Sequence, residues 1–197
     1  MTLVIVLAAG AAAVEVPDGA YVIAADSGAD AGIHVDLAVG DFDSIQPHTL
    51  EQLTNVEVYP PDKDATDLEL ALEAALRAGA TRVLVVGSDG GRLDHLFGLL
   101  VLLASEKWAA VEVDAQLGAA QAHVIRGTRT LHGAVGETIS LFALGGRAEG
   151  VTTSGLAYPL AGEPLEPGSS RGVSNLFHDP EARVTVDRGV VLAMRLG

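Results

Sequence analysis

Short apolar runs alternate with amphipathic stretches from the start of the chain to about residue 122. Residues 44–55, 65–80 and 92–108 place apolar side chains three and four positions apart, which predicts helices. The runs between them are typical of buried strands: LVIVLAA (3–9), YVIAAD (21–26), DLAVGD (36–41), VEVYP (56–60), RVLVVGSD (82–89) and AVEVDA (110–115). This alternation predicts a Rossmann-like α/β domain with a mostly parallel sheet, over residues 1–122.

The pattern changes in the rest of the chain, residues 123–197. Short segments of alternating polarity, such as TISLFAL (138–144), RVTVD (183–187) and VVLAMRL (190–196), are separated by glycine, proline and turn residues. No stretch here has a convincing helical period. We therefore expect a second domain, an antiparallel β-sandwich over residues 123–197.

Composition narrows the classes of partner. Of 197 residues, 49% are hydrophobic, enough for a sizeable core, and none is cysteine, which excludes disulfides and thiolate metal ligands. The formal charge of -14 argues against binding to nucleic acid or anionic membranes. The apolar run after Met1 lacks a basic start and is too short to span a bilayer. We expect a soluble cytoplasmic protein.

Aspartates gather where the predicted strands end. Asp26 ends one strand, and Asp41 and Asp43 follow the next in the stretch LAVGDFDSI. Ligands of open α/β sheets bind beyond the carboxyl ends of the strands. Carboxylates crowded there raise one another's pKa unless a cation lies between them, and Mg²⁺ is the natural choice. A lone D-x-D is more typical of a turn, so the metal hypothesis depends on the recurrence of acidic groups at successive strand ends.

A third acidic group lies in PPDKDATDLELAL, where Asp62 and Asp64 precede a predicted helix. Thr66 is placed to cap that helix, with Glu69 in capping-box register, so Asp67 belongs to its first turn. The helix start would fix the direction of the Asp67 carboxylate.

A glycine-rich loop, GSDGGR (87–92), precedes the third predicted helix. Such a loop can present backbone N–H groups to phosphate, and Arg92 adds a charged fork. The spacing fits neither a Walker motif nor a dinucleotide fingerprint. A phosphate cradle and a simple tight turn both remain open for this loop taken alone.

Five motifs in order, ADSGAD, GDFDSI, DKDATDLELAL, GSDGGRLDH and GSSRGVSNLF, resemble the signature of the thiamine pyrophosphokinase family. The resemblance covers nearly the whole chain. It implies an enzyme, a thiamine diphosphokinase, that transfers a pyrophosphoryl group from ATP to the hydroxyl of thiamine and releases AMP. It further implies Mg²⁺ as cofactor and a homodimer with shared active sites.

The resemblance also assigns residues by position. Asp41, Asp43 and Asp67 match the metal-binding positions and, with Arg92, the catalytic ones. Ser174 and Asn175, in the second domain, match the thiamine-binding positions. The positions implied to bind ATP or its metal are Asp26, Lys63, Asp64, Thr66, Ser88, Gly91, Arg92 and Asp94.

Two other functions use the same residues. A different Mg²⁺-dependent phosphotransferase or phosphohydrolase would need the same aspartates, and AMP release that depends on thiamine would separate the two. A noncatalytic thiamine or nucleotide sensor would bind without turnover and could lose Asp43 or Asp67. Both aspartates are present, which favours the enzyme.

Overall fold

The computed structural model describes residues 2–196, which form two compact units. The first contains the chain up to residue 102 together with residues 110–118, and the second contains residues 103–109 and everything from residue 119 onward. The change of unit at residues 118 and 119 lies close to the predicted boundary at residues 122 and 123. The sequence pattern did not indicate that residues 103–109 join the second unit.

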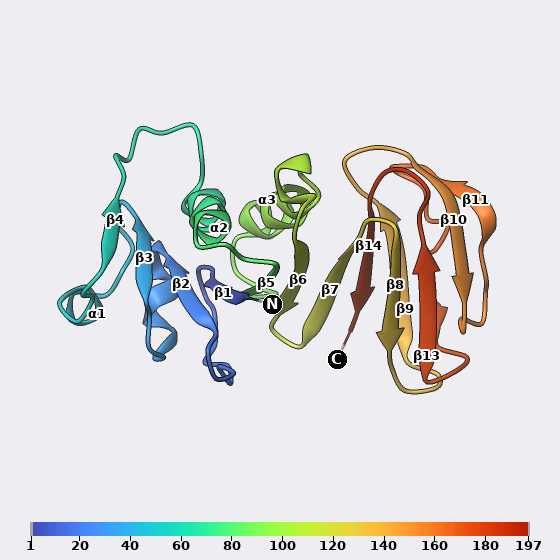
Figure 1. Ribbon diagram of the computed structural model, residues 1–197, viewed down its shortest axis with the longest axis horizontal. Coiled ribbons are helices and arrows are strands. Elements are labelled where there is room, and N and C mark those ends of the chain that lie inside the picture. The colour runs from blue at the N-terminus through green and yellow to red at the C-terminus, as the bar shows by residue number, and fades with distance from the viewer. Residues whose placement is uncertain (1, 197) are drawn as a thin grey trace. The chain divides into compact units, whose positions relative to one another are not determined.

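The first unit is built on a parallel sheet, as predicted (Figure 1). Its strands lie in the order β6-β5-β1-β2-β3-β4, and every neighbouring pair is parallel. The central strands are buried on both faces, which explains their continuous apolar runs. The strands are β1 (Leu3–Leu7), β2 (Tyr21–Ala25), β3 (Leu37–Gly40), β4 (Val56–Val58), β5 (Arg82–Gly87) and β6 (Glu112–Leu117).

The helices are shorter than the apolar periodicity predicts. Helix α1 is one turn, Pro47–Leu50, and α2 (Asp67–Arg77) packs its buried face against β1, β2 and β3. Helix α3 (Leu93–Leu103) ends before Ser105, whose side chain caps a separate 3-10 helix, η2 (Glu106–Trp108). A further 3-10 helix, η1 (Asp26–Ala31), had no signal in the sequence. No helix among residues 2–196 is long and apolar enough to cross a membrane.

The second unit contains two antiparallel sheets, which confirms the predicted sandwich. The first has the order β12-β9-β14-β7 and the second β11-β10-β13-β8. Inward-facing side chains of both sheets, among them Ile125, Leu141, Val151 and Val184, form one core. The strands are β7 (Ala120–Ile125), β8 (Thr128–His132), β9 (Thr138–Ala143), β10 (Ala148–Ser154), β11 (Ala161–Leu165), β12 (Asn175–Leu176), β13 (Glu181–Thr185) and β14 (Val191–Arg195).

The strand order reverses at β1 in the first unit, which places a topological switch point between β1 and β5. Ligands of open α/β sheets bind beyond the carboxyl ends of strands at such a point. The segments that follow β1 and β5 approach closely there, because a Cβ on Gly10 would lie 3.0 Å from Ser88 Cβ. Helix η1 is held at the same edge, since a Cβ on Gly28 would lie 2.1 Å from the carbonyl oxygen of Leu7.

We predict that Gly28→Ala destabilises the protein, because the added methyl collides with backbone that cannot move aside. An overpacked site of this kind costs about 1–3 kcal/mol, which lowers Tm by roughly 2–12 °C in a chain of this size. The matched control is Gly146→Ala in the exposed turn between β9 and β10, where nothing lies within 4 Å of the added methyl and Tm should change little. A Gly28→Ala variant as stable as the parent in thermal unfolding would contradict this packing.

Candidate active site

Three carboxylates converge beyond the carboxyl ends of β2 and β3. Asp26 directly follows β2, and Asp41 and Asp43 follow β3. Because β2 and β3 are adjacent and parallel, both strands deliver their last residues to the same edge of the sheet. One oxygen from each of the three side chains lies within 4.8 Å of the other two. The predicted convergence of Asp26, Asp41 and Asp43 is therefore present.

The backbone around these aspartates is unusual. Asp26 and Phe42 adopt φ angles of 45° and 60°, the left-handed region that non-glycine residues rarely occupy. Between the strands, a Cβ on Gly40 would lie 3.1 Å from Asp67 Oδ1 and 3.2 Å from Asp26 Cβ. Strained backbone and a glycine in close contact with two aspartates indicate a segment shaped for what the carboxylates bind.

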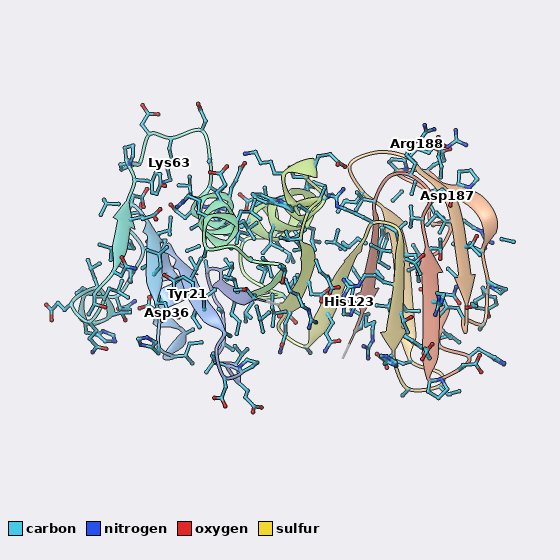
Figure 2. The ribbon with its side chains drawn as sticks, viewed as in Figure 1. Tyr21, Asp36, Lys63, His123, Asp187 and Arg188 are labelled. Carbon is cyan, nitrogen blue, oxygen red and sulfur yellow. The ribbon has the colours of Figure 1, made fainter. Side chains whose placement is uncertain are left out.

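Lys63 bridges the carboxylates of Asp41 and Asp67. Its Nζ lies 2.8 Å from Asp41 Oδ2 and 3.1 Å from Asp67 Oδ1. Figure 2 labels this side chain on the segment that joins β4 to α2. The hydrogen bond from Lys63 lowers the pKa of Asp41, and the same bond raises the pKa of Lys63. Asp41 and Lys63 are therefore charged partners, and Lys63 supplies a positive charge inside the acidic group.

Asp26 has no cationic partner among the residues that the structure describes. The residue is 8% exposed, and its Oδ1 atom is buried without a hydrogen bond from any described residue. Burial raises the pKa of Asp26, and the neighbouring carboxylates of Asp67 and Asp43 add to that rise. A buried oxygen without a donor, within reach of two further carboxylates, suits a hard divalent cation such as Mg²⁺. The residues therefore fit the predicted metal and add Asp26 to its candidate ligands.

The start of α2 holds Asp67 as the sequence predicted. Thr66 is the N-cap, and its Oγ1 accepts a hydrogen bond of 3.2 Å from the backbone N–H of Glu69. Asp67 is the first helical residue, and its carboxylate contacts Lys63. Asp64 lies exposed in the preceding segment. Of the predicted metal ligands, Asp41 and Asp43 lie in the tight cluster, and Asp67 joins it through Lys63.

The glycine-rich loop after β5 is exposed and contains the other predicted phosphate ligands. The N–H of Gly90 donates to Ser88 Oγ at 3.0 Å, and Gly91 has a φ of 79° that favours glycine. At the start of α3, Arg92 forms a two-point ion pair with Asp94, whose closest contact is Nη2 to Oδ2 at 2.6 Å. The guanidinium lowers the pKa of Asp94 to about 2. The planar guanidinium of Arg92 is thus exposed to solvent, and the Asp94 carboxylate fixes its orientation.

A second candidate site lies within the β-sandwich unit. A pocket of ≈ 410 Å³ is lined by Tyr158 and by residues 169–175, the stretch that contains the predicted thiamine ligands. Small-molecule sites usually enclose about 300–1,000 Å³. Ser174 has a φ of 56°, and its N–H donates to Ser140 Oγ at 3.0 Å, so the pocket loop is fixed to β9. Phe177 is 1% exposed and belongs to the core.

Asn175 uses its side chain within the protein. Its Oδ1 accepts hydrogen bonds from the N–H groups of Tyr158, at 3.0 Å, and Leu176, at 2.9 Å. Its Nδ2 donates to the carbonyl oxygen of Tyr158 at 2.7 Å. Direct contact of Asn175 with a substrate stays a prediction, and the structure adds Tyr158, which the sequence analysis missed. The signal available was an aromatic residue beside proline in GLAYPL, between two short strands.

Comparison with known proteins covers both units. A family model described as "Thiamin pyrophosphokinase, catalytic domain" matches residues 13–113, and one described as "Thiamin pyrophosphokinase, vitamin B1 binding domain" matches residues 122–191. The chain is 29% identical to thiamine pyrophosphokinase of Bacillus subtilis over 174 residues, which is 84% of this chain and 80% of that protein. It is 27% identical over 177 residues to thiamine pyrophosphokinase 1 of rice (Oryza sativa subsp. japonica), covering 82% of this chain and 66% of the rice protein.

A solved structure agrees with these matches. The crystal structure of the Bacillus subtilis thiamine pyrophosphokinase superposes with a TM-score of 0.83 at 25% identity, covering 100% of this chain and 99% of that one. The similarity therefore extends over both units.

The raised pKa of Asp26 makes a prediction about stability in metal-free protein. A carboxylate whose pKa is raised on folding favours the folded state at low pH, and that contribution is lost as the pH rises through its folded pKa. In chelator at neutral pH, Asp26→Asn should therefore raise Tm, and the gain should vanish once the pH falls below 3.8, the ordinary pKa of aspartate. Asp18→Asn, at an exposed position, is the control and should leave Tm unchanged. A lower Tm for Asp26→Asn in chelator would show that the ionised carboxylate stabilises the fold.

Proposed function

The chain belongs to the thiamine pyrophosphokinase family, and we propose that its acidic cluster and glycine-rich loop bind Mg²⁺ and ATP for that family's reaction. The enzyme transfers a pyrophosphoryl group from ATP to thiamine and yields thiamine diphosphate and AMP. The observation that carries the site assignment is the convergence of Asp26, Asp41 and Asp43 at the carboxyl edge of the sheet. The presence of both Asp43 and Asp67 favours turnover over a role in sensing.

The reaction forms one bond and breaks one. The hydroxyl oxygen of thiamine bonds to the β-phosphorus of ATP, and the bond from that phosphorus to the oxygen bridging to the α-phosphate breaks. The bridging oxygen leaves with AMP, and the hydroxyl proton passes to a base. Such transfers depend mainly on alignment and on neutralising charge at the phosphate oxygens.

Asp41, Asp43 and Asp26 would hold the magnesium ion, with Asp67 beside them on α2. Bound there, the ion neutralises phosphate charge and fixes the polyphosphate relative to the attacking hydroxyl. The carboxylates are set by backbone that cannot relax easily, since Asp26 and Phe42 are in the left-handed region. Their direction therefore does not have to be reorganised during the reaction.

Lys63 and Arg92 would neutralise the phosphates. Lys63 is tied to Asp41 and Asp67, so a phosphate or a metal in the cluster changes its ion pairing. Arg92 is exposed and is paired with its near neighbour Asp94, which a phosphate can replace as the partner of the guanidinium fork. Ser88, Gly91 and the N-terminus of α3 would contact the same phosphates, close to the switch point of the sheet.

The pocket of the second unit would bind thiamine. Ser174 contributes a hydroxyl from a loop held in place by β9. Tyr158, which is 60% exposed and lines the pocket, contributes an aromatic ring that would stack on a ring of the substrate.

The homodimer predicted from the family also belongs to this proposal, as does a cytoplasmic location. Helix α3 supports the dimer, because Leu93, Phe97 and Val101 are exposed at 76%, 65% and 42%. They are spaced four residues apart and so form one apolar stripe on the helix. A second copy of the chain would cover this stripe and would contribute its thiamine pocket to a shared site.

We predict that the protein, given ATP, Mg²⁺ and thiamine, forms AMP and thiamine diphosphate in equal amounts. Both products should disappear in chelator, because the carboxylates then have no cation to present to the phosphates. Chromatography of the nucleotides and thiamine esters measures both at once. ADP with thiamine monophosphate would instead identify a different phosphotransferase, and AMP formed without thiamine would identify a phosphohydrolase.

A shared site predicts that two inactive variants restore one another. Asp43→Asn damages the acidic cluster, and Ser170→Trp fills the thiamine pocket with an indole. In a mixed dimer, one of the two sites carries neither change, so activity should return toward about one quarter of the parent value if the chains exchange at random. Exchange is verified by mass spectrometry of differently tagged chains. No recovery after verified exchange would show that each site lies within one chain.

A further inference from the structure

The aromatic residue at the thiamine pocket is held by an unusual contact. Leu156 forms an isolated antiparallel bridge with Phe177, and the N–H of Ala157 donates to the carbonyl oxygen of Leu176 at 2.9 Å. This short pairing cannot extend through position 159, because proline has no N–H. Tyr158 therefore lies where backbone pairing stops.

The side-chain amide of Asn175 bonds the backbone of Tyr158 where the strand pairing stops. It accepts from the Tyr158 N–H at 3.0 Å and donates to the Tyr158 carbonyl at 2.7 Å, so both backbone groups of Tyr158 are bonded to one side chain. A side-chain amide has the same donor and acceptor as a peptide group and here replaces the missing strand partner. Asn175 is only 2% exposed, whereas Tyr158 is 60% exposed. The amide is thus buried in the protein, and Tyr158 is an exposed residue that lines the pocket.

We propose that Asn175 is a positioning residue that sets thiamine affinity through Tyr158, without reading the substrate itself. The inference rests on the proposed function, in which Tyr158 stacks on thiamine. A residue that is 60% exposed has few packing contacts to fix its side chain, so the direction of the Tyr158 ring depends on its backbone. Without the amide, both backbone groups of Tyr158 lose their partner and the ring loses its fixed position. Thiamine would then stack on a mobile Tyr158 ring and bind more weakly.

The test is a double-mutant cycle read as thiamine KM, ATP KM and kcat. Tyr158→Ala should raise thiamine KM about tenfold through lost stacking, and Asn175→Ala should raise it by a similar factor. The double variant should be no worse than Tyr158→Ala within about twofold, because both changes remove the same interaction. ATP KM and kcat should change by less than about twofold throughout.

A matched control separates positioning from general loss of stability. Thr153→Val removes another side-chain-to-backbone hydrogen bond of the same unit, from the Leu160 N–H to Oγ1 at 2.9 Å. It should lower Tm as Asn175→Ala does, but leave thiamine KM within about twofold. Should Asn175→Ala fail to fold, Asn175→Ser, which keeps a short polar side chain, takes its place.

A second readout needs no activity. Hydrogen exchange followed by NMR should show the Tyr158 amide protected in the parent and exchanging at least about tenfold faster in Asn175→Ala. The neighbouring Ala157 amide, bonded to Leu176, should stay protected. The proposal would be overturned if the two effects on thiamine KM multiplied to about a hundredfold in the double variant. It would also be overturned if the Tyr158 amide exchanged at the same rate in Asn175→Ala as in the parent. A parent protein that makes no thiamine diphosphate would refute the proposed function instead, and the exchange experiment would still decide whether Asn175 holds Tyr158.

Discussion

Electrostatic repulsion among the carboxylates at the ends of β2 and β3 is the constraint on which the first unit depends. The sheet brings Asp26, Asp41 and Asp43 within 4.8 Å of one another, and α2 adds Asp67 nearby. Lys63 offsets part of the repulsion by contacting Asp41 and Asp67. Asp26 has no cationic partner among the described residues, and its Oδ1 accepts no hydrogen bond from them. Burial raises its pKa and the neighbouring carboxylates add to the rise, so the fold retains an unfavourable interaction that a divalent cation would relieve.

The two units position their candidate binding residues in different ways, because one is built on a parallel sheet and the other on antiparallel sheets. A parallel sheet ends all its strands at one edge, which allows charged residues far apart in sequence to meet around a polyphosphate. The antiparallel sandwich instead offers loops fixed by neighbouring strands. Its pocket is shaped by hydrogen bonds to β9 and by the Asn175 amide, while its core is formed separately by apolar side chains of both sheets.

Sequence reasoning recovered what depends on periodicity and on strand ends. The parallel strands, the antiparallel half, the Thr66 cap and the grouping of Asp26, Asp41 and Asp43 follow from local pattern combined with the geometry of open sheets. It missed η1, because ADSGADAG has no helical period and the helix is held by contact between Gly28 and Leu7. It also missed the Asn175–Tyr158 contact, because 17 positions separate the two residues and the isolated Leu156–Phe177 bridge that brings their segments together has no local signal.

The most direct test of the account is thermal unfolding of the parent protein and of Asp43→Asn across a series of Mg²⁺ concentrations. A cation that binds the folded cluster and not the unfolded chain must raise Tm as its concentration exceeds the dissociation constant. We predict that the parent's Tm rises with Mg²⁺ and that the rise is largely lost in Asp43→Asn, with K⁺ at equal ionic strength having no comparable effect. A Tm that is independent of Mg²⁺ in the parent, or an equal rise in both proteins, would contradict the assignment of this cluster as the metal site.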